Sequence, residues 1–143
     1  MALPSDEQMR FLHRRRSGHL GTVSAEAVPH VVPVCYALSG DSAYIAIDRK
    51  PKQVPPKRLK RVRNVRENPK AVLLADHYDD NWERLGWVAL HGHVDLLDAG
   101  DERDAAVELL RQRYAQYRDM DLLDALVMAL RIERVNAWGD LEQ

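Results

Sequence analysis

The sequence predicts a mainly β domain, in which about six antiparallel strands form a closed or split barrel with about three helices outside the sheet. Three observations lead to this prediction. Short apolar segments, several with alternating polar and apolar residues, recur along the chain. Turn residues separate several of these segments by only a few positions, as in antiparallel hairpins. With about six strands in 143 residues, closing the sheet is an economical way to remove exposed strand edges.

The composition is that of one domain, spanning residues 1–143, with a formal net charge of −1. Cys35 is the only cysteine, so no disulfide can form within the chain, which is consistent with a reducing compartment. The first residues lack the apolar stretch of a signal peptide, and no apolar run approaches the ~18 residues needed to cross a bilayer. We therefore expect a cytoplasmic protein that does not enter a membrane.

The N-terminal third is predicted to contain one helix and three strands. Ser5 and Gln8 have the spacing of a capping box, which predicts a helix over residues 6–15. Pro33 has no N–H to donate to a neighbouring strand, which places its strand at an edge, at a bulge or beside a ligand. The apolar pattern predicts strands over residues 19–25, 30–38 and 43–47.

The rest of the chain is predicted to contain two helices and three strands. Residues 101–117 show the clearest helical pattern, and a short basic helix begins near residue 57 and ends at Asn68 and Pro69. Strands are predicted over residues 71–75, 87–97 and 126–138, with a bulge or a close approach at Gly92. The last segment also fits a helix, and we choose a strand because its end continues the extended pattern. The fifth and last strands are apolar on both faces, so we expect one face to fill the barrel and the other to meet a second subunit.

Positive charge is concentrated between the third and fourth predicted strands. Prolines keep the first half of this segment extended, and the basic helix follows it. Cations held so close together repel one another, so an anionic partner such as a phosphate or a carboxylate would stabilise the segment. A solvated basic surface is the alternative. The segment contains nine cations and no acid between its first and last members: Arg49, Lys50, Lys52, Lys57, Arg58, Lys60, Arg61, Arg63 and Arg66.

Other motifs give weaker signals. His91 and His93 have the spacing of two metal ligands on one strand, but no third ligand is fixed by the pattern, so we expect no metal site. Cys35 lacks the surroundings of a catalytic thiol and is expected to be part of the core. The sequence contains no glycine-rich phosphate loop. The three tryptophans favour packing, although beside a cationic site they would also suit a flat heteroaromatic ligand.

Several of these motifs together resemble the pyridoxamine 5'-phosphate oxidase-like split-barrel flavoproteins. The resemblance extends from about Arg10 to Trp138, and the chain is most similar to the branch of coenzyme F420-dependent (deazaflavin-dependent) oxidoreductases, found mainly in actinobacteria. It implies a six-stranded antiparallel split barrel of the FMN-binding type, with Greek-key topology and a homodimeric assembly. The residues that carry it are Ala27 to Tyr36, Ala46 to Lys52, Leu59 to Val65 with Asn68 and Pro69, Asp76 to Asp80 with Trp82, and Trp138.

The resemblance also implies where a cofactor binds. In this family a homodimer binds a flavin or a deazaflavin in two grooves between its subunits. The second strand would then line the ring system, the end of the third strand would lie beside the ribityl chain, and cations would bind the phosphate. One tryptophan would contact the ring and another would come from the second subunit. The candidate cofactor-binding residues are His30, Val32, Pro33, Val34, Ala46, Ile47, Lys50, Lys52, Arg61, Asn64, Trp87 and Trp138.

Coenzyme F420 is the expected cofactor, with FMN as the alternative. F420 carries a phosphodiester and a polyglutamate tail, so its several negative charges suit the basic segment better than FMN does. The segment from Lys52 to Lys57 is longer than in simpler family members, which leaves open which cations reach the phosphate. Catalysis would be hydride transfer to or from a small organic substrate, for which we name no essential acid or base.

Two further hypotheses come from other functional classes. The basic segment could bind the phosphates of a nucleic acid, but the nearly neutral total charge and the lack of a reading helix or an aromatic RNA platform argue against it. The protein could also carry the cofactor without turnover. We expect a homodimeric enzyme that acts on a small molecule, without a nucleic-acid partner.

Overall fold

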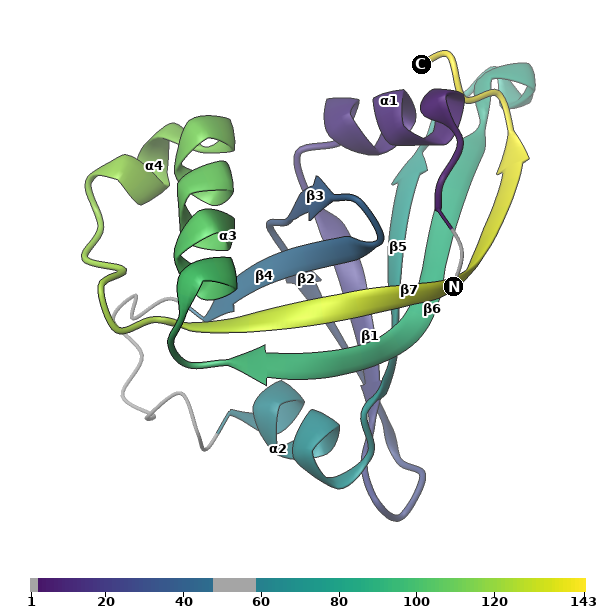
Figure 1. Cartoon of the computed structure of the whole chain (residues 1–143). Helices are drawn as coiled ribbons and strands as arrows, with labels where there is room; N and C mark the ends of the chain where they lie inside the picture. Colours follow the sequence, from purple (N-terminus) through teal and green to yellow (C-terminus); the bar gives the residue numbers. More distant parts are fainter. Residues whose placement is uncertain (1–2, 48–58) are drawn as a thin grey trace.

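The computed structural model describes residues 3–47 and 59–143, and Figure 1 shows their arrangement. Seven strands form one antiparallel sheet in the order β2-β1-β5-β6-β7-β4-β3. The elements in chain order are α1 (Asp6–Arg14), β1 (Gly18–Val23), β2 (Pro29–Val34), β3 (Ala37–Ser39), β4 (Ser42–Ile47), α2 (Lys60–Glu67), β5 (Lys70–His77), the short 3-10 helix η2 (Trp82–Arg84), β6 (Gly86–Leu97), α3 (Asp101–Arg113), α4 (Ala115–Arg118) and β7 (Leu126–Gly139). The mainly β fold with flanking helices is confirmed.

The number of strands predicted from the sequence was wrong, because the sheet has seven strands and not six. Residues 30–38 do not form one strand. They divide into β2 and β3, and the chain leaves the sheet at Cys35 and Tyr36. At this break the hydroxyl of Tyr114 accepts a hydrogen bond from the backbone N–H of Tyr36 at 3.1 Å, and it lies 3.1 Å from the Tyr36 carbonyl oxygen. A distant side chain therefore satisfies the backbone groups that a neighbouring strand would otherwise bind.

The helix predicted over residues 101–117 is interrupted at the same tyrosine. α3 ends at Arg113, Tyr114 has an extended backbone, and α4 is a separate short helix. The first helix agrees with its prediction, because the side chain of Ser5 accepts a hydrogen bond from the N–H of Gln8 at 3.2 Å and the Gln8 side chain accepts one from the N–H of Ser5. This capping box fixes where α1 begins.

The sheet curves around one apolar core, which the helices close at both ends. Alternate residues of β4, β5, β6 and β7 face this core, and Tyr36, Phe11 and Leu12 are among its largest fully buried side chains. Val62 and Val65 on α2 belong to the same cluster. In Figure 1, α1 lies over one end of the curved sheet and α2 below the other. The α2 helix, with its cations, therefore closes one end of the barrel.

A second apolar core lies outside the barrel, between the sheet and α3. Tyr44, Ala46 and Ala129 face away from the barrel interior and pack with residues of α3, including Ala106 and Leu110. This packing covers only the part of the outer sheet surface that β3, β4 and the first half of β7 provide (Figure 1). The outer surface of β1, β5 and the first half of β6 has no such helix over it among the described elements.

The bulge predicted at Gly92 is confirmed. The register between β6 and β7 shifts between His91 and Gly92, so that Glu133 is the extra residue on β7. A Cβ atom at Gly92 would lie 1.7 Å from the carbonyl oxygen of Arg131, so only glycine fits here. Among the described residues, no helix is long and apolar enough to cross a membrane.

Arg131 on β7 joins α3 to the sheet. Its guanidinium donates to both carboxylate oxygens of Glu102, at 2.5 and 3.0 Å, and to Asp95 at 2.9 Å. The hydroxyl of Tyr44 donates to the same carboxylate at 2.6 Å. The hydrogen bonds from Arg131 and then from Tyr44 lower the pKa of Glu102 to about 2. The folded state therefore favours the charged form of this carboxylate.

We expect Glu102→Gln to reduce the free energy of unfolding at neutral pH by about 1 kcal/mol, since the pair is partly exposed to solvent. A lowered pKa stabilises the folded state fully above the usual carboxyl pKa of about 4.3, and this contribution disappears as the pH falls towards the folded-state pKa. Urea unfolding at several pH values should therefore show a difference between variant and native protein that narrows in acid. Glu108→Gln, on the exposed face of α3, is the matched control. A difference that does not change with pH would contradict this account.

Candidate cofactor site

The candidate residues of β2 lie on an edge of the sheet. Among the described residues β2 pairs with β1 alone, so its other edge has free backbone groups. Val34 is buried and Val32 packs against the core, whereas Pro33 is exposed. The Nδ1 atom of His30 is buried and has no hydrogen-bond partner within the described residues. A ligand on the outer face of β2 would therefore meet the ring of Pro33 and the free backbone groups of the edge, whereas the imidazole of His30 lies on the opposite face, with Val32 and Val34.

The candidates at the end of β4 are buried. Ala46 packs under α3, and Ile47, with none of its surface exposed, faces the barrel interior. Their side chains are not accessible to a ligand in this structure, so any contact there would involve the backbone at the end of the strand. Lys50 and Lys52 lie outside the described residues.

The two candidates on α2 have different surroundings. Arg61 is partly exposed, whereas Asn64 is only 1% exposed and donates a hydrogen bond from Nδ2 to Oγ1 of Thr22 on β1, at 3.1 Å. Asn64 therefore holds the helix against the sheet and does not face solvent. This hydrogen bond could not be predicted from the sequence, because its two partners are 42 residues apart.

The N-terminus of α2 is suited to an anion. Its N-cap residue, Leu59, provides no side-chain hydrogen bond, and the first turn contains no acidic residue. The N–H groups of the first turn are thus left without a side-chain acceptor from the cap, and the helix dipole favours negative charge beside them. The described cations of this helix are Lys60, Arg61, Arg63 and Arg66.

A groove of about 550 Å³ lies on the uncovered outer surface of the sheet. Trp87, Leu74 and Ala89 provide apolar walls. Trp138 lies directly opposite Trp87 in the register of β6 and β7, so both rings are on the same face, and Trp138 is 54% exposed. The remaining lining residues are His19, Val72, Asp76, His91 and Asn136.

The groove lies in register with the candidate proline. Across the sheet, Pro33 pairs with His19, His19 with Leu74, Leu74 with Ala89, and Ala89 with Asn136. Directly opposed residues of antiparallel strands share one face, so these five form a row from the β2 edge across the groove. The structure thus brings Pro33, Trp87 and Trp138 to one surface, and it leaves the α2 cations outside the groove lining.

Of the eight lining residues only Trp87 was among the candidates from the sequence, and the other seven were missed. Four of the seven lie on β1 and β5. His19, Val72 and Leu74 lie on strands that were predicted, but only the fifth and last strands were expected to have a second apolar face. Residues 71–75 form a continuous apolar run, and in such a run Val72 and Leu74 necessarily face away from Leu73 and Ala75. This alternation could have been used to predict a second apolar face on the strand.

Burial lowers the pKa of the groove histidine His91. Desolvation, and then the positive charge of Arg134, lower the pKa of His91, which keeps the imidazole neutral at neutral pH. His93, beyond the bulge, instead has its Nδ1 3.3 Å from a carboxylate oxygen of Glu133. A neutral His91 suits a largely apolar surface because it adds no charge to it.

Comparison with known proteins identifies the family. The family model for pyridoxamine 5'-phosphate oxidase matches residues 4–139. The chain belongs to the pyridoxamine 5'-phosphate oxidase family. The family resemblance stated from the sequence is thereby confirmed, and the split-barrel fold agrees with it. No curated protein is significantly similar in sequence to this chain.

Several solved structures share this fold. A conserved hypothetical protein from Mycobacterium tuberculosis is 16% identical with a TM-score of 0.77, and the match covers 99% of this chain and 88% of that one. A heme binding protein from Mycobacterium smegmatis is 22% identical with a TM-score of 0.76, covering 100% of this chain but only 57% of that one. An F420 reductase is 20% identical with a TM-score of 0.67, covering 93% and 98%. At these identities the matches establish the fold alone.

The position of Asn64 leads to a prediction about stability. We expect Asn64→Ala to lower the free energy of unfolding by about 1 to 3 kcal/mol, because the buried hydroxyl of Thr22 loses its partner. Arg63→Ala, on the exposed side of the same helix, should change it by less than about 0.5 kcal/mol. Urea unfolding of both variants measures the difference. An Asn64→Ala variant as stable as the native protein would show that this amide is not a structural contact.

Proposed function

We propose that this protein is an oxidoreductase that binds coenzyme F420 at the interface of a homodimer and transfers hydride to or from a small organic substrate. The observation that carries the proposal is the apolar groove lined by Trp87, with Trp138 on the same face beside it, in register with the free edge of β2. A surface of this kind suits one side of a flat heterocycle, and a second subunit would cover the other side.

The homodimer is part of this proposal. An uncovered apolar sheet surface of this size is unusual in a monomer, and Trp138, Val31 and Leu74 are among the exposed large hydrophobic residues of the described chain. Two copies that pack through this surface by a two-fold axis would bury it twice. The family resemblance implies that the Trp138 of one subunit would then lie near the cofactor site of the other.

The acidic part of the cofactor fits the cationic side of the molecule. The uncapped N-terminus of α2 and its four cations would bind phosphate and carboxylate groups, and charge-assisted hydrogen bonds contribute about 1.5 to 3 kcal/mol each. The other five cations of the basic segment lie outside the described residues. FMN would use fewer of these groups than F420, which supports the choice of the longer anion.

The protein's own contribution to the reaction would be binding, orientation and exclusion of water. When bound, the deazaflavin would supply the hydride chemistry. Trp87, Ala89 and the ring of Pro33 would hold the heterocycle flat and dry. His91, kept neutral by burial, adds no competing charge to the groove. No described side chain is assigned as a general acid or base.

A second candidate function is heme binding, which one observation favours. His19 and His91 both line the groove, and an imidazole beside an apolar surface is a common axial ligand for heme iron. The similarity in fold to a heme binding protein is in line with this reading. A bound heme would show a Soret band that shifts when either histidine is replaced. A titration therefore distinguishes heme binding from F420 binding.

We expect purified protein to bind F420, as followed by the change in its absorbance and fluorescence, more tightly than FMN or hemin. Replacing Lys60 and Arg61 together by Gln should weaken F420 binding at least roughly tenfold, since each lost charge-assisted bond contributes more than 1 kcal/mol. Arg10→Gln, on α1 at the other end of the barrel, removes one positive charge as a control. Binding of FMN but not F420 would overturn the choice of cofactor, and binding of hemin alone would favour the second candidate.

We expect the native chain to be a dimer and Leu74→Lys to convert it to a monomer, because a lysine in the centre of the groove would bury an unpaired charge in the interface. Leu123→Lys is the matched control, since Leu123 is 76% exposed and lies outside the groove. Light scattering after size-exclusion chromatography gives the molar mass of each variant. A native protein with the mass of one chain would exclude the proposed interface.

A further inference from the structure

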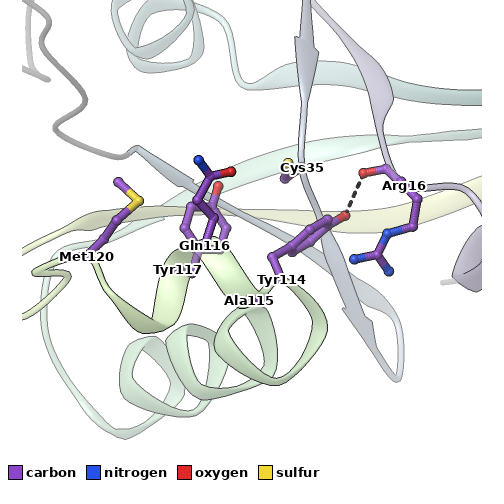
Figure 2. A pocket seen from close by; sticks show the side chains of 7 residues that line it. All are labelled: Arg16, Cys35, Tyr114, Ala115, Gln116, Tyr117 and Met120. Carbon is purple, nitrogen blue, oxygen red and sulfur yellow. Dashed lines mark hydrogen bonds between the residues drawn. The ribbon is translucent and has the colours of Figure 1, made fainter.

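A second pocket, of about 280 Å³, lies beside the break between β2 and β3. Figure 2 shows that its side chains come from three separate parts of the chain. Arg16 lies between α1 and β1, Cys35 lies between β2 and β3, and Gln116, Tyr117 and Met120 lie on α4 and just after it. The pocket shares no lining residue with the sheet groove.

The charge of this pocket is positive. Among the described residues, its lining contains Arg16 and no acidic side chain. The guanidinium of Arg16 lies 4.7 Å from the centre of the Tyr114 ring, and its Nη2 donates to the carbonyl oxygen of Arg113 at 2.7 Å. These two contacts hold the group in place and leave other N–H groups able to donate. An anion at the rim would therefore meet a fixed guanidinium.

The walls are aromatic and polarisable. The rings of Tyr114 and Tyr117 pack edge to face, with centroids 5.7 Å apart and an interplanar angle of 76°. The thioether of Met120 and the thiol of Cys35 complete an apolar lining that favours a flat ring. The side-chain amide of Gln116 has no hydrogen-bond partner among the described residues, so it can bind a polar group of a ligand.

The size of the pocket restricts the ligand. Sites for drug-sized molecules span about 300 to 1,000 Å³, so 280 Å³ suits a molecule with one ring. We propose that this pocket binds a small aromatic carboxylic acid of the benzoate type, with its carboxylate at Arg16 and its ring against the tyrosines, Met120 and Cys35. This site does not depend on the cofactor, and it goes beyond the proposed oxidoreductase activity.

Cys35 provides a direct readout of occupancy, because it is the only thiol in the chain and lines the pocket. An aromatic disulfide such as 4,4'-dithiodipyridine reacts with the Cys35 thiolate to form a mixed disulfide and releases one equivalent of 4-thiopyridone, which absorbs light. A ligand in the pocket should slow this reaction. The experiment uses the full chain without any cofactor. In a control reaction glutathione replaces the protein, which shows whether an additive affects the reagent itself.

Benzoate and salicylate should protect Cys35, whereas benzamide, which lacks the charge, and cyclohexanecarboxylate, which lacks the flat ring, should protect it less. Arg16→Gln should weaken protection by benzoate roughly tenfold, as expected for loss of a charge-assisted hydrogen bond. Arg16→Lys should retain part of the protection, and Arg10→Gln should leave it unchanged. If Arg16→Gln does not fold, Gln116→Leu at an exposed helix position removes the amide contact instead and should also weaken protection by benzoate.

Equal protection by benzoate and benzamide, or protection that persists unchanged in Arg16→Gln, would overturn the proposal. So would a Cys35 that no aromatic disulfide reaches, because the pocket would then be closed to molecules of this size. Since no deazaflavin enters this assay, failure here leaves the proposed function standing. Failure of the F420 titration likewise leaves this pocket unaffected.

Discussion

The hydroxyl group of Tyr114 binds the backbone of Tyr36 at the point where the chain passes from one edge strand of the sheet to the other. β2 and β3 lie at opposite ends of the strand order although they follow one another in the chain. The Tyr114 hydroxyl binds the backbone of Tyr36 between them, and Arg113 donates to the same oxygen at 3.0 Å. The Tyr36 hydroxyl in turn donates to the carbonyl oxygen of Leu12 at the end of α1, at 2.5 Å. Burial raises the pKa of Tyr36, so this donor keeps its proton.

Tyr114 also explains the two places where the elements predicted from the sequence were wrong. Apolar periodicity and the capping box predicted α1, the basic helix and most strands, and the long last strand was chosen correctly over a helix. The segment of residues 30–38 was not recognised as two strands, and the helix at residues 101–117 was not recognised as two helices. Both interruptions occur where Tyr36 and Tyr114 meet, across 78 residues. Local patterns describe local backbone preferences, and a hydrogen bond between distant residues overrides them.

The candidate site was predictable in part, for related reasons. Pro33 and Trp87 were assigned to one ligand site through the family resemblance, and the register of the strands puts both on the same face. Burial could not be predicted for Asn64 and Ile47, since it depends on which helix packs over which end of the barrel. The groove itself arises because α3 covers only part of the outer sheet surface. The sequence of a strand can show that its outer face is apolar, but whether a helix covers that face depends on the whole fold.

The extra residue at the β6–β7 bulge also decides which side chains this half of the sheet offers to its surroundings. Before the bulge, the even-numbered Met128, Leu130 and Ile132 point into the barrel, and after it the odd-numbered Val135 packs against that core. If β7 ran through Glu133 without the bulge, the alternation would continue unbroken over the same residues, and Trp138 would turn inward. A family member that kept this residue but not the bulge would keep the composition of its last strand and yet exchange its inner and outer faces. Loss of Glu133 together with the bulge would instead leave Trp138 on the outer face, because the remaining residues would alternate regularly.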